Sequence, residues 1–205
     1  MILCDIGNTS VDLFIDGNRT KLSVENFDPV TLQDDVYYVS VNTSLNEHLR
    51  EHTNWHDLRE LIDWDKYYPT MGIDRIMVCE AVEDGVIVDA GSAITVDVMS
   101  DGLYQGGFIS LGLRSAQEAY ARLSPALEMS FNFEVDLTIM AKNTPDALTV
   151  GFLGPLIEKI GKIRKPLYLT GGDALVLSPF FYGSTVDEDL IFKGMKKLIE
   201  KGVKC

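Results

Sequence analysis

The 205-residue sequence has few cysteines and no long hydrophobic run. Its three cysteines, Cys4, Cys79 and Cys205, lie far apart and form no C-x-x-C pair. This pattern predicts neither a disulfide framework nor a zinc site, and it favours a reducing compartment. No apolar stretch approaches the ~18 residues that a membrane-spanning helix needs, and the N-terminus has no signal-peptide pattern. We therefore expect a cytoplasmic protein that binds no membrane.

Positive charge is also scarce, because 18 lysine and arginine residues stand against 31 aspartate and glutamate residues, for a net charge of −13. Nonspecific nucleic-acid binding requires clustered lysine and arginine, so we expect no direct contact with nucleic acid. Hydrophobic residues make up 46% of the chain and charged residues 24%, which is typical of globular proteins. At ~150 residues per domain, the length allows one large domain or two small ones.

Short apolar runs separated by turn residues predict two β-meanders, each followed by helices, and this order favours an α/β fold with mixed sheets. The predicted strands are residues 2–6, 10–15, 19–24, 36–41, 86–90, 95–99, 104–109 and 167–170, and the predicted helices are residues 44–51, 73–82, 112–123, 146–163 and 190–201.

The two meanders begin with the same pattern. Residues 2–9 and 86–93 both read as three apolar residues, then Asp-x-Gly, a polar residue and a small one, and the aspartates Asp5 and Asp89 are 84 residues apart. Each copy continues into an apolar strand that ends in Asp-Gly. Because matching flanks accompany the motif, we interpret it as an internal repeat.

Each Asp-x-Gly turn has the groups that phosphate and cations require. The glycine allows a sharp turn, the backbone N–H groups can bind phosphate oxygens without a lysine, and the aspartate can hold a cation. A single copy would be read as an ordinary tight turn. Two copies facing each other across a cleft would hold a polyphosphate and its metal.

The motifs, taken in order, resemble those of type III pantothenate kinases, within the superfamily of acetate and sugar kinases, heat-shock ATPases and actin. The resemblance extends from residue 1 nearly to the C-terminus, and the ordered set is far more specific than any single motif. The matching segments are Asp5–Thr9, Gly72–Arg75, Asp89–Thr95, Gly106-Gly107, Gly112-Leu113, Asn143-Thr144 and Thr170–Gly172.

The resemblance implies an α/β fold of two duplicated RNase H-like halves, the actin-like ATPase fold, with nucleotide in the cleft between them. Residues 1–84 would form the first half, with the first phosphate turn and the catalytic aspartate. Residues 85–187 would form the second half, with the second phosphate turn and the adenosine site. The C-terminal helix, within residues 188–205, would return to the first half.

The implied reaction transfers phosphate from ATP to pantothenate, giving 4′-phosphopantothenate in the first step of coenzyme A biosynthesis. Asp74 would be the catalytic base, Mg²⁺ would accompany ATP, and Asp89 would hold a monovalent cation, K⁺ or NH₄⁺. The implied ATP-binding residues are Asp5, Ile6, Gly7, Asn8, Thr9, Ser10, Ser92, Gly171 and Gly172, and the implied pantothenate-binding residues are Tyr68, Gly72, Ile73, Asp74, Arg75 and Thr144.

The local sequence leaves alternatives open at two of these residues. Asp74 lies at the start of a predicted helix, where aspartate is common as a cap, although the helix dipole would also favour a charged catalytic base. Arg75 offers a planar fork for a substrate carboxylate, but an exposed surface arginine explains it equally well.

The sequence departs from the family pattern in three places. Ser92 stands where threonine is usual and keeps the hydroxyl, Leu111 stands where proline is frequent, and the segment between Thr9 and Gly72 is short. The sequence has no G-x-x-x-x-G-K-[ST] loop, which excludes the P-loop class, and it lacks the protein-kinase motif set.

The resemblance also implies a homodimer with pantothenate pockets at the interface, to which Thr144 would contribute across the subunits. Two other functions remain possible. The chain could be another small-molecule kinase on the same scaffold, or a non-catalytic nucleotide-binding regulator.

Two further clusters favour structural roles. His48, His52 and His56 are spaced four residues apart, so a continuous helix would place them on one side as a metal site, although an exposed polar face is the simpler interpretation. Trp55, Trp64, Tyr67 and Tyr68 form an aromatic stretch that we expect to pack in the core, with Tyr68 set apart as a substrate contact.

Overall fold

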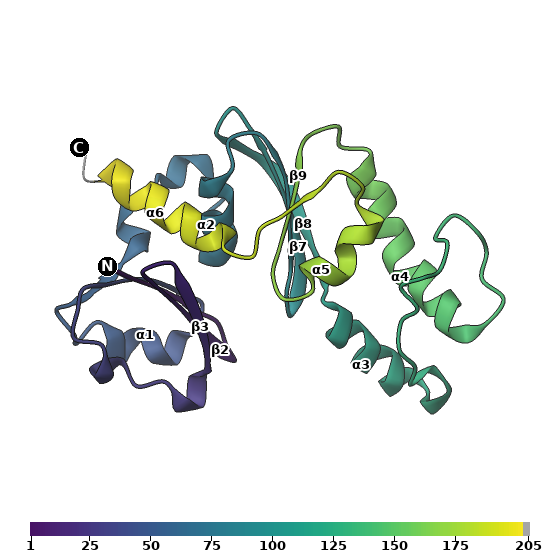
Figure 1. Ribbon diagram of the computed structural model, residues 1–205, viewed down its shortest axis with the longest axis horizontal. Helices are drawn as coiled ribbons and strands as arrows, with labels where there is room; N and C mark the ends of the chain where they lie inside the picture. Colours follow the sequence, from purple (N-terminus) through teal and green to yellow (C-terminus); the bar gives the residue numbers. More distant parts are fainter. Residues whose placement is uncertain (203–205) are drawn as a thin grey trace. The chain divides into compact units, whose positions relative to one another are not determined.

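The computed structural model describes residues 1–202, which form two compact units. Among the described residues, the first unit comprises residues 1–83, 102–104 and 189–202, and the second comprises residues 84–101 and 105–188. Each unit contains one five-stranded mixed sheet (Figure 1). The α/β fold with two similar halves is therefore confirmed.

The sheet of the first unit has the order β3-β2-β1-β4-β5. Strands β1 to β3 form an antiparallel meander, and β4 and β5 continue the sheet parallel to β1. The β2–β3 turn uses Asp16 and Gly17, both with positive φ, as a tight hairpin requires. The strands are β1 (Ile2–Ile6), β2 (Ser10–Ile15), β3 (Asn18–Ser23), β4 (Val36–Ser40) and β5 (Trp55–Asp57).

Three α-helices, α1 (Thr43–Leu49), α2 (Ile73–Ala81) and α6 (Leu190–Gly202), belong to the first unit. Helix α6 lies against α2 (Figure 1), and Gly194 is required at their contact because a Cβ there would overlap the carbonyl oxygen of Met77. Short 3₁₀ helices at Val24–Asn26, Pro29–Thr31, Leu58–Leu61 (η3) and Trp64–Lys66 (η4) connect the longer elements.

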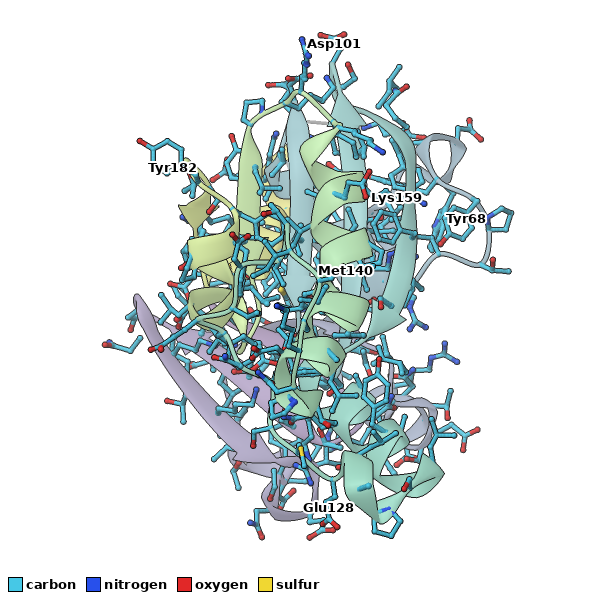
Figure 2. The ribbon with its side chains drawn as sticks, turned by 90° about the vertical axis from the view of Figure 1, so that its right-hand side faces the viewer. Tyr68, Asp101, Glu128, Met140, Lys159 and Tyr182 are labelled. Atoms are coloured by element: carbon cyan, nitrogen blue, oxygen red, sulfur yellow. The ribbon has the colours of Figure 1, made fainter. Side chains whose placement is uncertain are left out.

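The sheet of the second unit has the order β10-β9-β6-β7-β8. Its β6 and β7 are antiparallel and its β6 and β9 parallel, so the sheet reproduces the strand arrangement of the first unit. Figure 2 shows Asp101 at the tip of the β7–β8 hairpin. The strands are β6 (Gly85–Ala90), β7 (Ala93–Ser100), β8 (Leu103–Leu111), β9 (Leu167–Thr170) and β10 (Thr185–Val186).

Helices α3 (Leu113–Leu123), α4 (Thr144–Gly161) and α5 (Ala174–Leu177) belong to the second unit, with 3₁₀ turns at Pro125–Leu127 and Ser178–Phe180. Its core includes a stacked pair of rings, Phe131 and Phe152, whose centroids lie 5.3 Å apart. Across residues 1–202, no helix has the length and apolar character to span a bilayer.

The three histidines do not share a helix. His48 lies in α1, His52 follows it in a turn, and His56 lies in β5. Within residues 1–202, no group of three histidine, cysteine or acidic side chains could hold a metal ion. His56 instead forms a hydrogen bond with Asp35 at 3.0 Å and packs on Tyr37, so the three histidines do not form one helix face.

The aromatic stretch divides into two kinds of residue. Trp55 and Tyr67 are buried, as expected of core residues, whereas Trp64 and Tyr68 are about two-fifths exposed. The expectation of core packing is therefore wrong for Trp64. The third cysteine, Cys205, lies outside the described residues, and both Cys4 and Cys79 are buried.

Candidate functional site

The first phosphate turn follows β1 directly. The Gly7 N–H donates to the Ser10 carbonyl at 2.9 Å, which closes the turn and leaves Asn8 and Thr9 exposed. A Cβ on Gly7 would lie 3.2 Å from the Ser10 oxygen, so a larger residue would strain the turn. The hydroxyl, amide and backbone groups at this turn fit an anionic phosphate.

Asp5, at the start of this turn, is paired across the β1–β2 register with Asp12. Asp12 is buried and forms ion pairs with Arg19 at 2.8 Å and Lys21 at 3.3 Å. Side chains that face each other in such a pair lie on the same side of the sheet, so the two cations offset the repulsion between two neighbouring carboxylates.

The second phosphate turn follows β6 and is one residue shorter. The Gly91 N–H donates to the Ala93 carbonyl at 3.0 Å, and the exposed Ser92 occupies the tip. The Ser92 carbonyl accepts hydrogen bonds from the Gly112 N–H at 3.2 Å and from the Ser115 hydroxyl at 3.0 Å. Two hydrogen bonds thus join the second turn to the start of α3.

Glycines surround Asp89 at the base of this second turn. A Cβ on Gly171, whose φ is +87°, would collide with the Asp89 carboxylate and lie 2.6 Å from the Ala90 carbonyl oxygen. A Cβ on Gly112 would lie 2.6 Å from the Ser92 carbonyl oxygen. The structure therefore brings Gly171 and Asp89 together, although they are far apart in the sequence.

Thr95 faces Asp89 across the β6–β7 register. Its hydroxyl oxygen is buried and has no hydrogen-bond partner, which is unusual because buried polar atoms are nearly always bonded. An orphan hydroxyl beside a carboxylate is the oxygen-rich donor set that a cation prefers. Asp89 and Thr95 therefore fit a cation, although sequence analysis singled out only Asp89.

A second cluster forms at the start of α2. Gly72 precedes the helix, and a Cβ on it would lie 2.5 Å from the Asp74 carboxylate. The Asp74 carboxylate accepts from the Arg75 N–H at 2.9 Å and stays half-buried. Asp74 thus lies in the first turn of α2.

Arg75 is 5% exposed, so the interpretation of Arg75 as an exposed surface arginine is wrong. Its guanidinium donates to the Tyr68 hydroxyl at 2.7 Å and to the Tyr104 hydroxyl at 3.3 Å. The guanidinium also lies 5.9 Å from the Tyr68 ring centre. Figure 2 shows Tyr68 projecting from the loop that carries it. The structure therefore brings Tyr68 to Arg75, and Asp74 precedes Arg75 in the same helix.

Tyr104 is the member of this cluster that sequence analysis missed. It lies in β8, in the three-residue segment that groups with the first unit, and its ring centre is 6.0 Å from that of Tyr68. The only sequence signal is its place between the Asp101-Gly102 turn and Gly106-Gly107. Nothing in that spacing indicates a contact with a residue in α2.

A buried acidic residue supports the cluster from the same helix. Glu80 accepts a hydrogen bond from the Tyr67 hydroxyl at 2.9 Å and pairs with Lys201 of α6 at 2.7 Å. Burial alone would raise the pKa of Glu80, but the Lys201 ammonium and the Tyr67 hydroxyl lower its pKa below the usual value. Burial and the Glu80 charge raise the pKa of Tyr67, which keeps that hydroxyl a donor.

Thr144 lies in the second unit, at the first position of α4. The preceding Asn143 caps the helix, because its side chain accepts from the Asp146 N–H at 2.9 Å. Thr144 therefore begins α4, and its role in substrate binding stays a prediction. Gly172 is exposed beside Gly171.

Sequence comparison shows which known proteins this chain is similar to. A family model described as type III pantothenate kinase matches residues 24–165. A type III pantothenate kinase of Sulfurimonas denitrificans is 48% identical over the full length of both chains. One from Campylobacter jejuni is 40% identical, covering 98% of this chain and 97% of its own.

Solved structures agree on the fold. A Campylobacter jejuni protein, described as a conserved member of the Baf family of transcriptional activators, superposes with a TM-score of 0.89 at 36% identity and covers 100% of both chains. A Sinorhizobium meliloti protein described as a 2-dehydro-3-deoxygalactonokinase has a TM-score of 0.61 at 12% identity, covering 98% of this chain and 96% of its own, which shows a shared fold. On the matched family and the full-length relatives together, the chain belongs to the type III pantothenate kinase family.

Proposed function

We propose that this chain is a pantothenate kinase, which transfers the γ-phosphoryl group of ATP to pantothenate and releases ADP and 4′-phosphopantothenate. The observation that carries the proposal is the buried Arg75 beside Asp74 at the start of α2. Such an arrangement offers a guanidinium for the pantothenate carboxylate and a carboxylate for its hydroxyl. The full-length relatives named as type III pantothenate kinases support the same substrate.

In the proposed mechanism, Asp74 acts as general base. It accepts the proton of the pantothenate hydroxyl while that oxygen forms a bond to the γ-phosphorus, and the bond between the γ-phosphorus and the ADP oxygen breaks. Arg75 binds the carboxylate and fixes the distance of the hydroxyl from Asp74. Tyr68 and Tyr104 hold the guanidinium in place.

ATP binding would fall to the two Asp-x-Gly turns. We assign its phosphates to Asp5–Ser10 and Ser92, and its adenosine to Gly171 and Gly172. Asp89, with the orphan hydroxyl of Thr95, would hold K⁺ or NH₄⁺. Mg²⁺, when bound with ATP, supplies charge neutralisation at the phosphates. The proposal also includes a homodimer to which Thr144 contributes across subunits, a cytoplasmic location, and no nucleic-acid or membrane partner.

The decisive experiment measures ADP release from the purified protein with ATP, Mg²⁺ and pantothenate, once with potassium and once with sodium alone. We expect turnover that requires pantothenate and potassium. Turnover that requires another acceptor would keep the kinase scaffold and overturn the substrate. Turnover in sodium equal to that in potassium would overturn the cation site.

The base is tested by Asp74→Asn, which keeps the size of the side chain and removes its basicity. We expect a fall in kcat of about 10²–10⁴-fold with ATP affinity unchanged. Unaltered turnover would remove Asp74 from the base role.

One observation favours a second function, because the Campylobacter jejuni structure with 36% identity is described as a transcriptional activator. A non-catalytic regulator would bind ATP and show no turnover with any acceptor in the folded state. The same assay, joined with an ATP-binding measurement, separates the two functions.

A further inference from the structure

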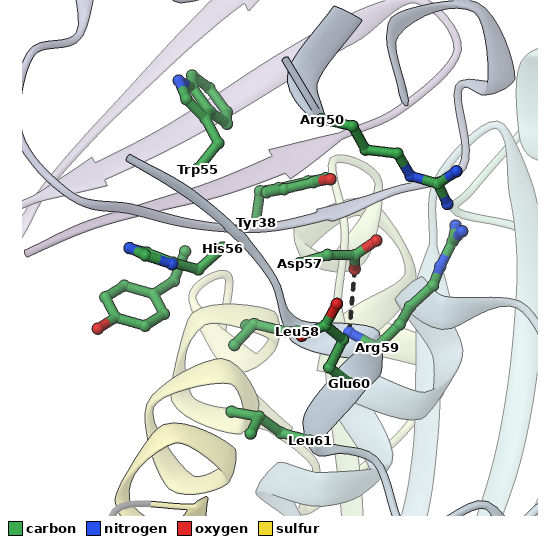
Figure 3. Close-up of a pocket in the computed structure, with 10 residues that line it drawn as sticks. Tyr38, Arg50, Trp55, His56, Asp57, Leu58, Arg59, Glu60 and Leu61 are labelled. Carbon is green, nitrogen blue, oxygen red and sulfur yellow. Dashed lines mark hydrogen bonds between the residues drawn. The ribbon is translucent and has the colours of Figure 1, made fainter. Parts of the chain in front are cut away.

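A hollow lies at the open edge of the first sheet, beside β5. Its volume is about 650 Å³, within the range of pockets that hold small organic molecules. The walls come from β4, β5, η3 and the residue that ends α1 (Figure 3). The lining includes no residue of the Asp5 turn or of the Arg75 cluster, so this pocket is separate from the groups assigned to the reaction.

Two arginines bring positive charge to a lining that also carries the acidic residues Asp57 and Glu60. Figure 3 shows the side chains of Arg50 and Arg59 extending to the same side of the pocket. The Arg59 guanidinium donates to the Ser40 carbonyl at the end of β4, which fixes its position. Within residues 1–202, neither Arg50 nor Arg59 belongs to an ion pair. Two guanidiniums that form no ion pair attract an anionic group such as a planar carboxylate or a tetrahedral phosphate.

Tyr38 adds a donor to the same side of the pocket. It is 1% exposed, and no hydrogen bond joins its hydroxyl to another described residue. In Figure 3 the hydroxyl points to the side where Arg50 and Asp57 lie. Burial and the nearby Asp57 carboxylate raise the pKa of Tyr38 to about 12. The hydroxyl is therefore protonated at neutral pH and can donate.

Asp57 limits what this pocket accepts. Its carboxylate accepts from the Arg59 N–H at 3.0 Å and so begins η3, but it still repels an anion placed close to it. The lining also includes the apolar side chains of Trp55 and Leu58, which are both buried. A ligand with one anionic end and an apolar body matches this lining. A polyanion would instead be repelled by the chain, whose net charge is −13.

We propose that this pocket binds a small organic anion, whose carboxylate or phosphate group is held by Arg50, Arg59 and the Tyr38 hydroxyl while its apolar part lies on Trp55 and Leu58. The site does not depend on the proposed kinase function. Its occupant would bind together with ATP and pantothenate rather than compete with them.

The test uses Trp55 as a reporter in the full chain. The chain has two tryptophans, and Trp64→Phe leaves Trp55 alone, with Trp64 exposed enough for this change to be mild. Its fluorescence is titrated with inorganic phosphate and with butyrate, and sodium chloride at equal ionic strength is the control. We expect a saturable change with at least one probe, and the responding probe identifies the anionic group.

Variants in the Trp64→Phe background locate the binding. Arg50→Gln should weaken binding about tenfold or more, and Tyr38→Phe about fivefold, as expected for hydrogen bonds to an anion. Arg122→Gln, which removes an exposed arginine of α3, should change nothing. Arg50 is exposed, so its replacement should leave the melting temperature unchanged.

Three results would overturn the site. These are no saturable response to either probe, a response matched by chloride, or equal affinity in the parent and Arg50→Gln proteins. Kinase turnover is measured on the same samples so that the two proposals are tested separately. Loss of turnover alone would contradict the kinase function and would not change the conclusion about the anion pocket.

Discussion

The two Asp-x-Gly turns begin alike and differ in what faces the aspartate. Asp5 faces a second carboxylate, Asp12, which Arg19 and Lys21 neutralise. Asp89 faces the unpartnered hydroxyl of Thr95, and Gly171 closes on it. A duplicated motif thus holds one aspartate among charges and the other among glycines and a hydroxyl. On this difference, the proposed cation site belongs to the second turn rather than the first.

The largest expected effect on stability comes from Gly171, which packs against Asp89 at the second turn. Gly171→Ala should destabilise the protein by about 2–4 kcal/mol, because the new Cβ collides with Asp89 and φ is positive. Gly172→Ala is the matched control, since open space surrounds that position. Thermal melting compares the two, and equal melting temperatures would contradict the tight packing around Asp89.

The residues that face the two aspartates should respond in opposite ways. Asp12→Asn should destabilise by about 1–3 kcal/mol, because it removes the buried carboxylate that pairs with Arg19 and Lys21. Thr95→Val removes an unsatisfied hydroxyl and should leave the melting temperature unchanged or higher.

The Thr95→Val protein also tests the cation site. If Thr95 binds the cation, the potassium concentration that gives half-maximal turnover should rise several-fold. Potassium activation identical to that of the parent would restrict the site to Asp89.

Acid should affect the first unit through Glu80. Its folded pKa is lowered, so Glu80 stabilises the fold above its unfolded pKa of about 4.3, and this contribution is lost as pH falls through the lower folded value. We expect melting temperature to fall less steeply below pH ~4.3 in Glu80→Gln than in the parent. Glu158→Gln should keep the parent slope, because Glu158 lies at the surface of the second unit and solvent screens its ion pair with Lys162.

The smallest expected effect concerns Tyr104. Tyr104→Phe removes one of the hydroxyls that orient Arg75 and should raise the KM for pantothenate about three- to tenfold, with kcat and the KM for ATP nearly unchanged. A purely structural role would instead lower the melting temperature and leave both KM values alone. Tyr120→Phe, in α3 of the second unit, is a suitable control.

The repeat, the meanders and most helices could be predicted because they are local. Hydrophobic alternation and the Asp-Gly turns determine the strands, and the predicted span 73–82 is close to the observed α2. Strands β5 and β10 have three and two residues, too few for any period. They form because a parallel neighbour offers its free edge.

The parts of the site that were missed depend on contacts between distant segments. Tyr104 reaches Arg75 from another strand, and Gly171 approaches Asp89 from across β9 and β6. The burial of Arg75 was also missed, since a charged residue in an amphipathic helix is expected outside unless it has partners. The loop after β6 is one residue shorter than the loop after β1, which explains why Thr95 rather than Val96 takes the place of Asp12.

Helix α6 closes against α2 through Gly194, so the first unit is assembled from the two ends of the chain. On the ribosome its sheet emerges early but must wait for the last helix before its apolar face is covered. The second unit, nearly continuous in sequence, can fold in the meantime. We therefore expect the usual N-to-C order of folding during synthesis to be reversed, with completion of the first unit as the final event.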